Sequence, residues 1–422
     1  MKVIDRRRFL QMGLATTAGV VAASVLPPAR RTLAAPSGRS SELMSTQRTL
    51  ASAPLADRRL VVLDCAGGND GISMLPPRQG TARAAYQAAR PATALEASTL
   101  LPVSADVGMH PALTRIHARG PAIIQGVGVT APDLSHFEML RRWWSGDQDS
   151  LHQTQTGFLG RICDIIGDAT APAVGLSLGY GPSPALISER VVTLSMNPYS
   201  DGSFPTFDDI DMHRAWVRAW KVMAERQPTE TVPFCSARDG AAYAKAFSGL
   251  ARQFPAAGGS YPDIDLGYQL QLAARICAQD NGIRILHIPF YADFDTHDEH
   301  LTRHARIMDD LDQAVEAFLQ DLAARGIEDQ VLVLMTSEFG RRLFDNESYG
   351  LDHGAGSHLM ALGPVAGGLF GQYPSLTNLD DGDNLIATVS MTDYYATLAE
   401  RWFGVPSSEV IPGGSLIPGF LV

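Results

Sequence analysis

The chain of 422 residues contains only four cysteines, and they lie too far apart in the sequence for a C-x-x-C pair. This spacing excludes a zinc knuckle and a thioredoxin-type redox site. Basic residues are also scarce, because 34 Lys and Arg stand against 45 Asp and Glu, which gives a net charge of −11. A surface of that sign repels a phosphate backbone, so nucleic acid is not an expected partner.

The sequence also lacks a long apolar run. Its N-terminal run, Met12–Leu26, is about 15 residues long, whereas a comfortable membrane span needs about 20. The run follows Arg6-Arg7 and Phe9-Leu10, a pattern typical of twin-arginine export. We predict a signal peptide over residues 1–35, with an uncleaved N-terminal anchor as the alternative.

This leader predicts where the protein works. We expect the export machinery of the twin-arginine pathway as a partner, no stable membrane span after cleavage, and a periplasmic or extracellular location. Residues 36–57 are rich in Ser, Ala, Arg and Pro and are predicted to be a linker. Residues 58–422 are predicted to form a single domain, with a variable insert or cap around 165–260, where Gly, Pro and Ser are frequent.

Short apolar runs alternate with stretches of helical period along this domain. The runs that predict strands are Arg59–Leu63, Pro121–Val127, Ile283–Pro289, Gln330–Thr336 and Leu359–Leu362. Helices are predicted over His110–Arg119 and Leu301–Arg325. Strands that alternate with helices favour an α/β fold with a mostly parallel sheet. Hydrophobic residues make up 45% of the chain, enough for a core of ordinary size.

Polar clusters follow these strands. The clusters are Asp64 with Asp70, the stretch Pro132–Phe137, the stretch Asp293–His300, the stretch Ser337–Arg341, and Asp352-His353 with His358. In an open parallel sheet, ligands bind beyond the carboxyl ends of the strands. Carboxylates and imidazoles that converge there can hold a divalent metal ion, such as zinc, calcium or manganese. No dinucleotide fingerprint is present, because the glycines of Gly67–Gly71 lack the G-x-G-x-x-G spacing.

Each cluster also has a purely structural interpretation. Ser135 fits an N-cap, with Glu138 three residues later as in a capping box. The Asp295-Thr-His triplet fits a turn, and His297 with His300 fits one face of a helix. Five such clusters at successive strand ends favour a real site over five unrelated turns.

Several strings in one order resemble the exported bacterial family called domain of unknown function 1501. They are Gly67–Gly71, Met109–Leu113, Gln125–Gly128, Pro132–Phe137, Thr156–Arg161, Phe294–His297, Thr336–Arg341, Leu351–Gly354 and Gly367–Gly371. The likeness runs from about Leu60 to Leu376 and is thin between about Asp168 and Asp280. A twin-arginine leader is usual in that family.

This family resembles the alkaline phosphatase and sulfatase superfamily in turn. The resemblance implies an alkaline phosphatase-like parallel sheet between helix layers, with a metal site at the strand ends. It places Asp64 and Ser135 at one metal. The further ligands that it implies are Asp295, His297, Glu338 and His353, with Asp352 or His358 in a rebuilt pair and Asp70 beside or instead of Asp64. The superfamily's Asp-His pair appears here as Glu338-Phe339, and Phe339 cannot bind a metal.

The function implied is an exported, metal-dependent hydrolase of a phosphate or sulfate ester, a small anionic substrate. In this role Ser135 is the nucleophile, His136 a proton shuttle, and Arg341 or Arg342 a clamp on a substrate oxygen. The alternative is a secreted binding or assembly protein that keeps the fold without the chemistry, and Phe339 favours it. A metal with only a structural role is a third possibility.

Overall fold

The computed structural model describes residues 53–149, 151–167, 173–199 and 259–421. The predicted signal peptide and residues 36–52 of the predicted linker lie outside these ranges. Among the described helices, none is both long and apolar enough to cross a membrane.

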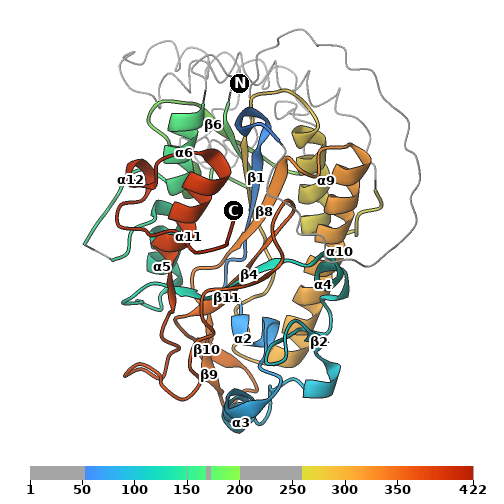
Figure 1. Cartoon of the computed structure of the whole chain (residues 1–422), viewed down its shortest axis with the longest axis vertical. Coiled ribbons are helices and arrows are strands. Elements are labelled where there is room, and N and C mark those ends of the chain that lie inside the picture. Colours follow the sequence, from blue (N-terminus) through green and yellow to red (C-terminus); the bar gives the residue numbers. More distant parts are fainter. Residues whose placement is uncertain (1–52, 150, 168–172, 200–258, 422) are drawn as a thin grey trace, which may run out of the picture.

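A nine-stranded sheet runs through the centre of the described residues (Figure 1). In spatial order its strands are β12 (Gly368–Phe370), β4 (Ala122–Gly128), β11 (Ser357–Leu362), β8 (Val331–Thr336), β1 (Arg59–Asp64), β7 (Ile285–Pro289), β5 (Gly175–Leu178) and β6 (Thr193–Met196), with β13 (Val389–Ser390) paired to β4. Only β11 is antiparallel to its neighbours, β4 and β8. The predicted α/β fold with a mostly parallel sheet is therefore confirmed.

Helices cover both faces of the sheet. One face carries α4 (Thr114–Arg119), α9 (Asp265–Cys277) and α10 (His300–Ala324). The other carries α5 (His136–Ser145), α6 (Phe158–Ile166), α11 (Met391–Thr397), the π-helical segment η5 (Leu398–Phe403) and α12 (Ser407–Val410). The two groups of helices stand on opposite sides of the strands in Figure 1.

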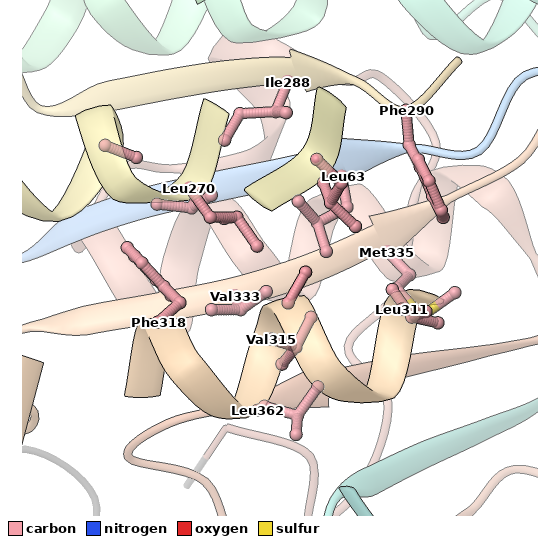
Figure 2. Packing of buried hydrophobic residues seen from close by; sticks show 14 of the residues in the cluster. Leu63, Leu270, Ile288, Phe290, Leu311, Val315, Phe318, Val333, Met335 and Leu362 are labelled. Atoms are coloured by element: carbon pink, nitrogen blue, oxygen red, sulfur yellow. The ribbon is translucent and has the colours of Figure 1, made fainter. Parts of the chain in front are cut away.

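Strand β1 shows why the apolar runs form buried strands. Val61 and Leu63 pack into the core beneath α9 and α10, while Leu60 and Val62 pack into the core on the other face. A strand buried on both faces reads as a continuous apolar run, because side chains alternate between the faces. Figure 2 shows the first of these cores, where Leu63 and Val333 of the sheet meet the helical side chains.

Helix α10 is also buried on its apolar side, and its apolar residues recur with a period near 3.6. Its apolar residues Ile307, Leu311, Phe318 and Leu322 lie on one face and are buried in the core. Figure 2 shows Leu311 and Phe318 of this face against the sheet. The helix ends at Ala324, and Gly326 just beyond it has a φ of 68°, a conformation that closes helices at low cost.

Smaller elements lie at the lower end of the sheet in Figure 1. They are α2 (Gly71–Met74), α3 (Gly80–Ala89), the pair β2 (Leu101–Pro102) and β3 (Gly108–Met109), and the antiparallel pair β9 (Arg341–Asp345) and β10 (Leu351–His353). Single 3-10 turns occur at η2 (Leu55–Asp57), η3 (Ala97–Thr99) and η4 (Pro184–Leu186).

The structure differs from the sequence-based expectation in two places. The helix predicted from His110 begins only at Thr114, because residues 110–113 form a turn in which Nδ1 of His110 accepts a hydrogen bond from the amide of Ala112 at 3.1 Å. Part of the expected insert belongs to the sheet, since β5 and β6 extend it beyond β7. Both strands have only four residues, too few to show a period.

Candidate metal centre

The candidate site lies where the parallel strands end. The segment after β7 carries Asp295 and His297, and the segment after β4 enters α5 at His136. His353 is the last residue of β10. Because β1, β4, β7 and β8 run in the same direction, the segments that leave them meet at one edge of the sheet.

Three imidazole Nε2 atoms approach the carboxylate of Asp295. The Nε2 atoms of His297 and His353 each lie 3.1 Å from Oδ1, and Nε2 of His136 lies 3.6 Å from Oδ2. The donor atoms of His136, Asp295 and His353 all lie within 4.8 Å of one another. Nε2 of His297 lies 3.0 Å from Nε2 of His353. We call His136, His297 and His353 the rim histidines.

Each rim histidine is held through its other ring nitrogen. The three contacts of Nδ1 are His136 with Oε1 of Glu338 at 2.8 Å, His297 with Oδ1 of Asp352 at 3.1 Å, and His353 with the carbonyl oxygen of Leu134 at 2.9 Å. Carboxylates and carbonyls accept hydrogen bonds, so Nδ1 donates in every case. In the neutral ring Nε2 then keeps its lone pair, and all three lone pairs face Asp295.

This donor set fits a divalent cation. Two lone pairs 3.0 Å apart, on His297 and His353, repel each other unless a proton or a cation lies between them. Metal-ligating histidines ordinarily donate their second N–H to a carboxylate or a backbone carbonyl, which fixes the tautomer and orients the ring. The rim histidines, together with Asp295, are therefore the residues that would hold a metal.

The charges around Asp295 favour its ionised form. Burial alone would raise its pKa, but the hydrogen bond and charge of Arg341, together with His297, lower it to about 2. The hydrogen bond with Glu338 raises the pKa of His136, whereas burial lowers the pKa of His353. The site thus combines a stable carboxylate with imidazoles of different basicity.

Arg341 positions Asp295 from within the protein. Its Nη2 donates to Oδ1 of Asp295 at 2.6 Å, and the side chain is fully buried. Its remaining N–H groups donate to the carbonyl oxygens of Gly67, Gly68, Phe294 and Leu351. This guanidinium is committed to main-chain and carboxylate acceptors, which differs from the clamp on a substrate oxygen that the sequence suggested.

The backbone around the site adopts special conformations. Leu134, whose carbonyl accepts from His353, has a φ of 62°, an uncommon value for a residue other than glycine. A Cβ atom at Gly350 would collide with the main chain of His297. A Cβ atom at Gly68, which has a φ of 75°, would collide with the ring of Phe339. These two glycines therefore allow the site to close around the rim histidines.

Ser135 lies directly before His136, at the N-cap position of α5. Its side chain makes no capping hydrogen bond, although the position is the one that the structural interpretation assigns to it. Glu138 does not complete a capping box and instead binds the guanidinium groups of Arg141 and Arg142. The partly exposed Ser135 hydroxyl is therefore not used to cap the helix.

Phe339 forms the apolar wall of the site. Its ring centroid lies 4.8 Å from that of His136 and 4.7 Å from that of His353, and the side chain is buried. Glu338, the residue before it, is buried on the other side of His136 and also accepts from the amide of Gly67 at 2.7 Å. Phe339 thus packs against two rings of the candidate metal centre instead of offering a further ligand.

Three of the predicted ligands have other contacts. Asp64 accepts from Nε1 of Trp144 at 2.9 Å and lies 3.3 Å from Nε2 of His287. Asp70 forms a fully buried ion pair with Arg90, at 2.5 Å. The buried His358 lies on the antiparallel strand β11, and its Nδ1 accepts a hydrogen bond from the amide of Gly126 at 3.2 Å. These contacts are distinct from the group around Asp295.

His136, which the sequence predicts as a proton shuttle, lies with its Nε2 facing Asp295 among the other imidazoles. Sequence reasoning did not include it among the candidate metal ligands. The available signal was its position, because it directly follows the loop that leaves β4 and opens a helix. Glu338 and Asp352, expected to be ligands, contact the outer nitrogens of His136 and His297 instead.

The fold and the site together define an α/β protein with a candidate histidine- and aspartate-lined metal centre. A family model described as a protein of unknown function (DUF1501) matches residues 244–402, in agreement with the resemblance that the motifs predict. A search of curated proteins finds no match.

Several solved structures are similar in overall fold at low sequence identity. The C-terminal periplasmic domain of EcEptC from Escherichia coli, in complex with zinc, has a TM-score of 0.39 and 10% identity, covering 84% of this chain and 87% of that chain. The PsFucS1 sulfatase from Pseudoalteromonas sp. has a TM-score of 0.37 and 12% identity, covering 84% and 70%. The lipoteichoic acid synthase LtaP from Listeria monocytogenes has a TM-score of 0.39 and 8% identity, covering 88% and 79%.

Proposed function

We propose that this protein is an exported, metal-dependent hydrolase of phosphate or sulfate esters. The observation that carries the proposal is the convergence of three Nε2 lone pairs on Asp295, each fixed by an acceptor at Nδ1. Zinc is the cation that suits this set best, because imidazole ligands favour zinc while calcium and manganese favour oxygen. The proposed location is the periplasm or the extracellular space, and the proposed substrate is a small anionic ester.

Ser135 is the nucleophile in this proposal. Ser135 directly precedes His136 in the chain, and its hydroxyl makes no capping hydrogen bond, which leaves it available to a substrate. The serine oxygen would form a bond to phosphorus or sulfur while the bond to the departing alcohol oxygen breaks, and the serine proton would leave with the alcohol. Water would then break the new bond to the serine oxygen, return a proton to that oxygen and release the anion. A bound divalent cation would supply positive charge that stabilises both a serine alkoxide and the oxygens of the reacting ester.

The chain's own residues prepare the site for this reaction. Arg341 keeps Asp295 ionised and fixes its orientation. Glu338 and Asp352 set the tautomers of His136 and His297. These contacts organise the site before a substrate arrives, which is the arrangement that lowers the cost of charge development in a reaction.

A second candidate is a secreted protein that binds metal or a partner without catalysis. Two observations favour it: the guanidinium of Arg341 is fully committed inside the protein, and Phe339 fills the wall beside His136 and His353. Under this alternative the cation would serve binding or folding alone.

The test compares turnover with metal content. The purified full-length protein is stripped with a chelator, reloaded with zinc, calcium or manganese, and assayed on panels of aryl phosphates and aryl sulfates. We expect turnover with at least one metal, and we expect Ser135→Ala to abolish turnover while it still binds the metal. His152→Ala is the control, because His152 is exposed and contacts only Asp149 among the described residues. A metal-loaded protein without any turnover would support the binding protein and exclude the hydrolase.

A further inference from the structure

A fully buried set of charged and polar side chains lies behind the rim of the site. Asp70 belongs to the Gly67–Gly71 string, which the proposed reaction leaves without a role. Its carboxylate pairs with Arg90 through two contacts, at 2.5 and 3.1 Å. Nε2 of His300 lies 3.1 Å from Oδ2 of the same carboxylate. The exposed fraction of all three side chains is close to zero.

Hydrogen bonding extends from this carboxylate to the metal-binding loop. Oγ1 of Thr296 lies 2.8 Å from Nδ1 of His300, and Thr296 is the residue between Asp295 and His297. Burial would raise the pKa of Asp70, but Arg90 and His300 hold it well below its usual value, so the carboxylate is ionised. Burial lowers the pKa of His300 and keeps its ring neutral. Nε2–H of His300 therefore donates to Asp70, and the Thr296 hydroxyl donates to Nδ1.

Arg90 connects the same carboxylate to the other side of the site. Its Nη2 and Nε donate to the carbonyl oxygens of Arg342 and Leu343, each at 2.9 Å. These residues belong to β9 and directly follow Arg341, which holds Asp295. Two elements that supply or orient the ligands, the Asp295–His297 loop and β9, are thus tied to one buried ion pair.

We propose that Asp70, Arg90, His300 and Thr296 form a positioning network that holds Asp295 and His297 in the geometry needed to bind a metal. The inference rests on the metal centre of the proposed function, and it assigns a role to the Gly-Gly-Asn-Asp-Gly string. None of the four residues touches the cation. They act by fixing the loop, since a buried hydrogen-bonded network has one preferred arrangement.

The experiment removes one hydroxyl from this network. Thr296→Val takes away the donor to His300, whereas Thr296→Ser keeps it. Zinc affinity is measured by titration calorimetry on the full-length protein after metal removal. We expect Thr296→Val to weaken zinc binding by about 10- to 100-fold, the range found for outer-shell partners, and Thr296→Ser to restore most of the affinity.

Asp312→Asn is the matched structural control. Asp312 is also fully buried on α10, and it accepts from the amides of Arg115 and Ile116 at 3.0 and 2.7 Å. It makes no contact with the ligand loop among the hydrogen bonds of the described residues. We expect this variant to lower the melting temperature while it leaves the zinc affinity unchanged.

A second readout works without metal. In the metal-free protein, the imidazole ¹⁵N signals of His297 report its tautomer, and we expect Thr296→Val to shift or broaden them while Thr296→Ser does not. The inference is overturned if Thr296→Val binds zinc as the wild type does, or if Asp312→Asn loses as much affinity. A wild type that binds zinc through this network but hydrolyses no ester would sink the hydrolase and leave the positioning network in place.

Discussion

The rim histidines and the buried histidines behind them are opposite tautomers: the proton is on Nδ1 in the first group and on Nε2 in the second. Of the five buried histidines among the described residues, the four that we compare and call the buried histidines are His110, His300, His304 and His358; the fifth, His287, lies on β7 beside Asp64. Each rim histidine donates from Nδ1, so that in the neutral ring the Nε2 lone pair faces Asp295. In the buried set, Nε2–H of His300 and His304 donates to Asp70 and Asn69. Nδ1 of His110 and His358 accepts from a backbone amide, so there too the proton is on Nε2.

This difference separates the candidate metal centre of the proposed function from a cluster of similar composition. At the rim, the lone pairs converge on a half-exposed carboxylate, Asp295. In the buried set, the corresponding carboxylate, Asp70, is paired with Arg90 as Asp295 is with Arg341, but it receives an N–H from His300. Both regions contain histidines beside an aspartate, so composition alone does not distinguish them. The two regions are distinguished by the outer hydrogen-bond partner of each ring, because that partner selects the tautomer.

The largest expected effect comes from removing a rim histidine. His353→Ala deletes an Nε2 that lies 3.1 Å from Asp295. We expect zinc affinity to fall by more than the roughly 100-fold upper value for outer partners, and turnover to be lost with it. Calorimetry and the ester assay measure both, with the exposed His152→Ala as the control. Undiminished zinc binding in His353→Ala would remove the rim histidines from the metal centre.

The next largest effect concerns the buried ion pair and appears in stability. Asp70→Asn leaves the Arg90 guanidinium buried without its counter-charge, which should lower the free energy of unfolding by about 3–5 kcal/mol. Glu316→Gln, at the more exposed pair with Arg119, should cost about 1 kcal/mol or less. Urea unfolding compares the two variants. Equal losses of unfolding free energy would show that the buried ion pair stabilises the fold no more than the exposed one does.

The buried histidines also predict the direction of the pH dependence. Burial lowers the pKa values of His110 and His358 to about 4, against about 6.5 in the unfolded chain. Between these pH values the unfolded state binds protons that the folded state does not, so stability falls as the pH falls from 6.5 towards 4. The full loss is about 3 kcal/mol for each ring.

The variant His358→Gln should flatten this part of the profile, whereas His152→Gln at the surface should leave the buried contribution in place. Unfolding measured at several pH values between 4 and 7 tests both. An unchanged slope in His358→Gln would mean that its ring titrates equally in both states.

The sequence allowed much of the fold to be predicted, because its central strands are buried on both faces. Runs such as Leu60–Leu63 and Val331–Met335 have no polar position, and only a central parallel strand or a buried helix produces that pattern. The four-residue strands β5 and β6 carry too little pattern to be identified. The antiparallel direction of β11 depends on the path of the chain through β9 and β10, which no local signal shows.

For the site, the sequence indicated which residues lie close together but not the role of each one. Asp295, His297 and His353 were expected near one another because they follow the carboxyl ends of successive predicted strands, and the structure places them together. Their separation from Asp70 could not be predicted, since it depends on the pairing of Asp70 with Arg90, twenty residues along the chain. A tautomer is set by a partner distant in sequence, so it leaves no motif.

The smallest expected effect tests the outer partners of the rim directly. Asp352→Asn keeps the shape of a side chain whose exposed fraction is 52%, but it replaces the charged acceptor of His297 Nδ1 with an amide. We expect zinc affinity to fall by about 10-fold, at the lower end of the range for outer partners, because solvent screens the lost charge. The fold should be unaffected, and calorimetry with a parallel melting curve checks both. An exposed acid without an outer-shell role, such as Asp149, gives the comparison through Asp149→Asn. If both substitutions leave the affinity unchanged, His297 does not need a fixed tautomer, and the distinction between the rim and buried histidines would rest on Glu338 and Leu134 alone.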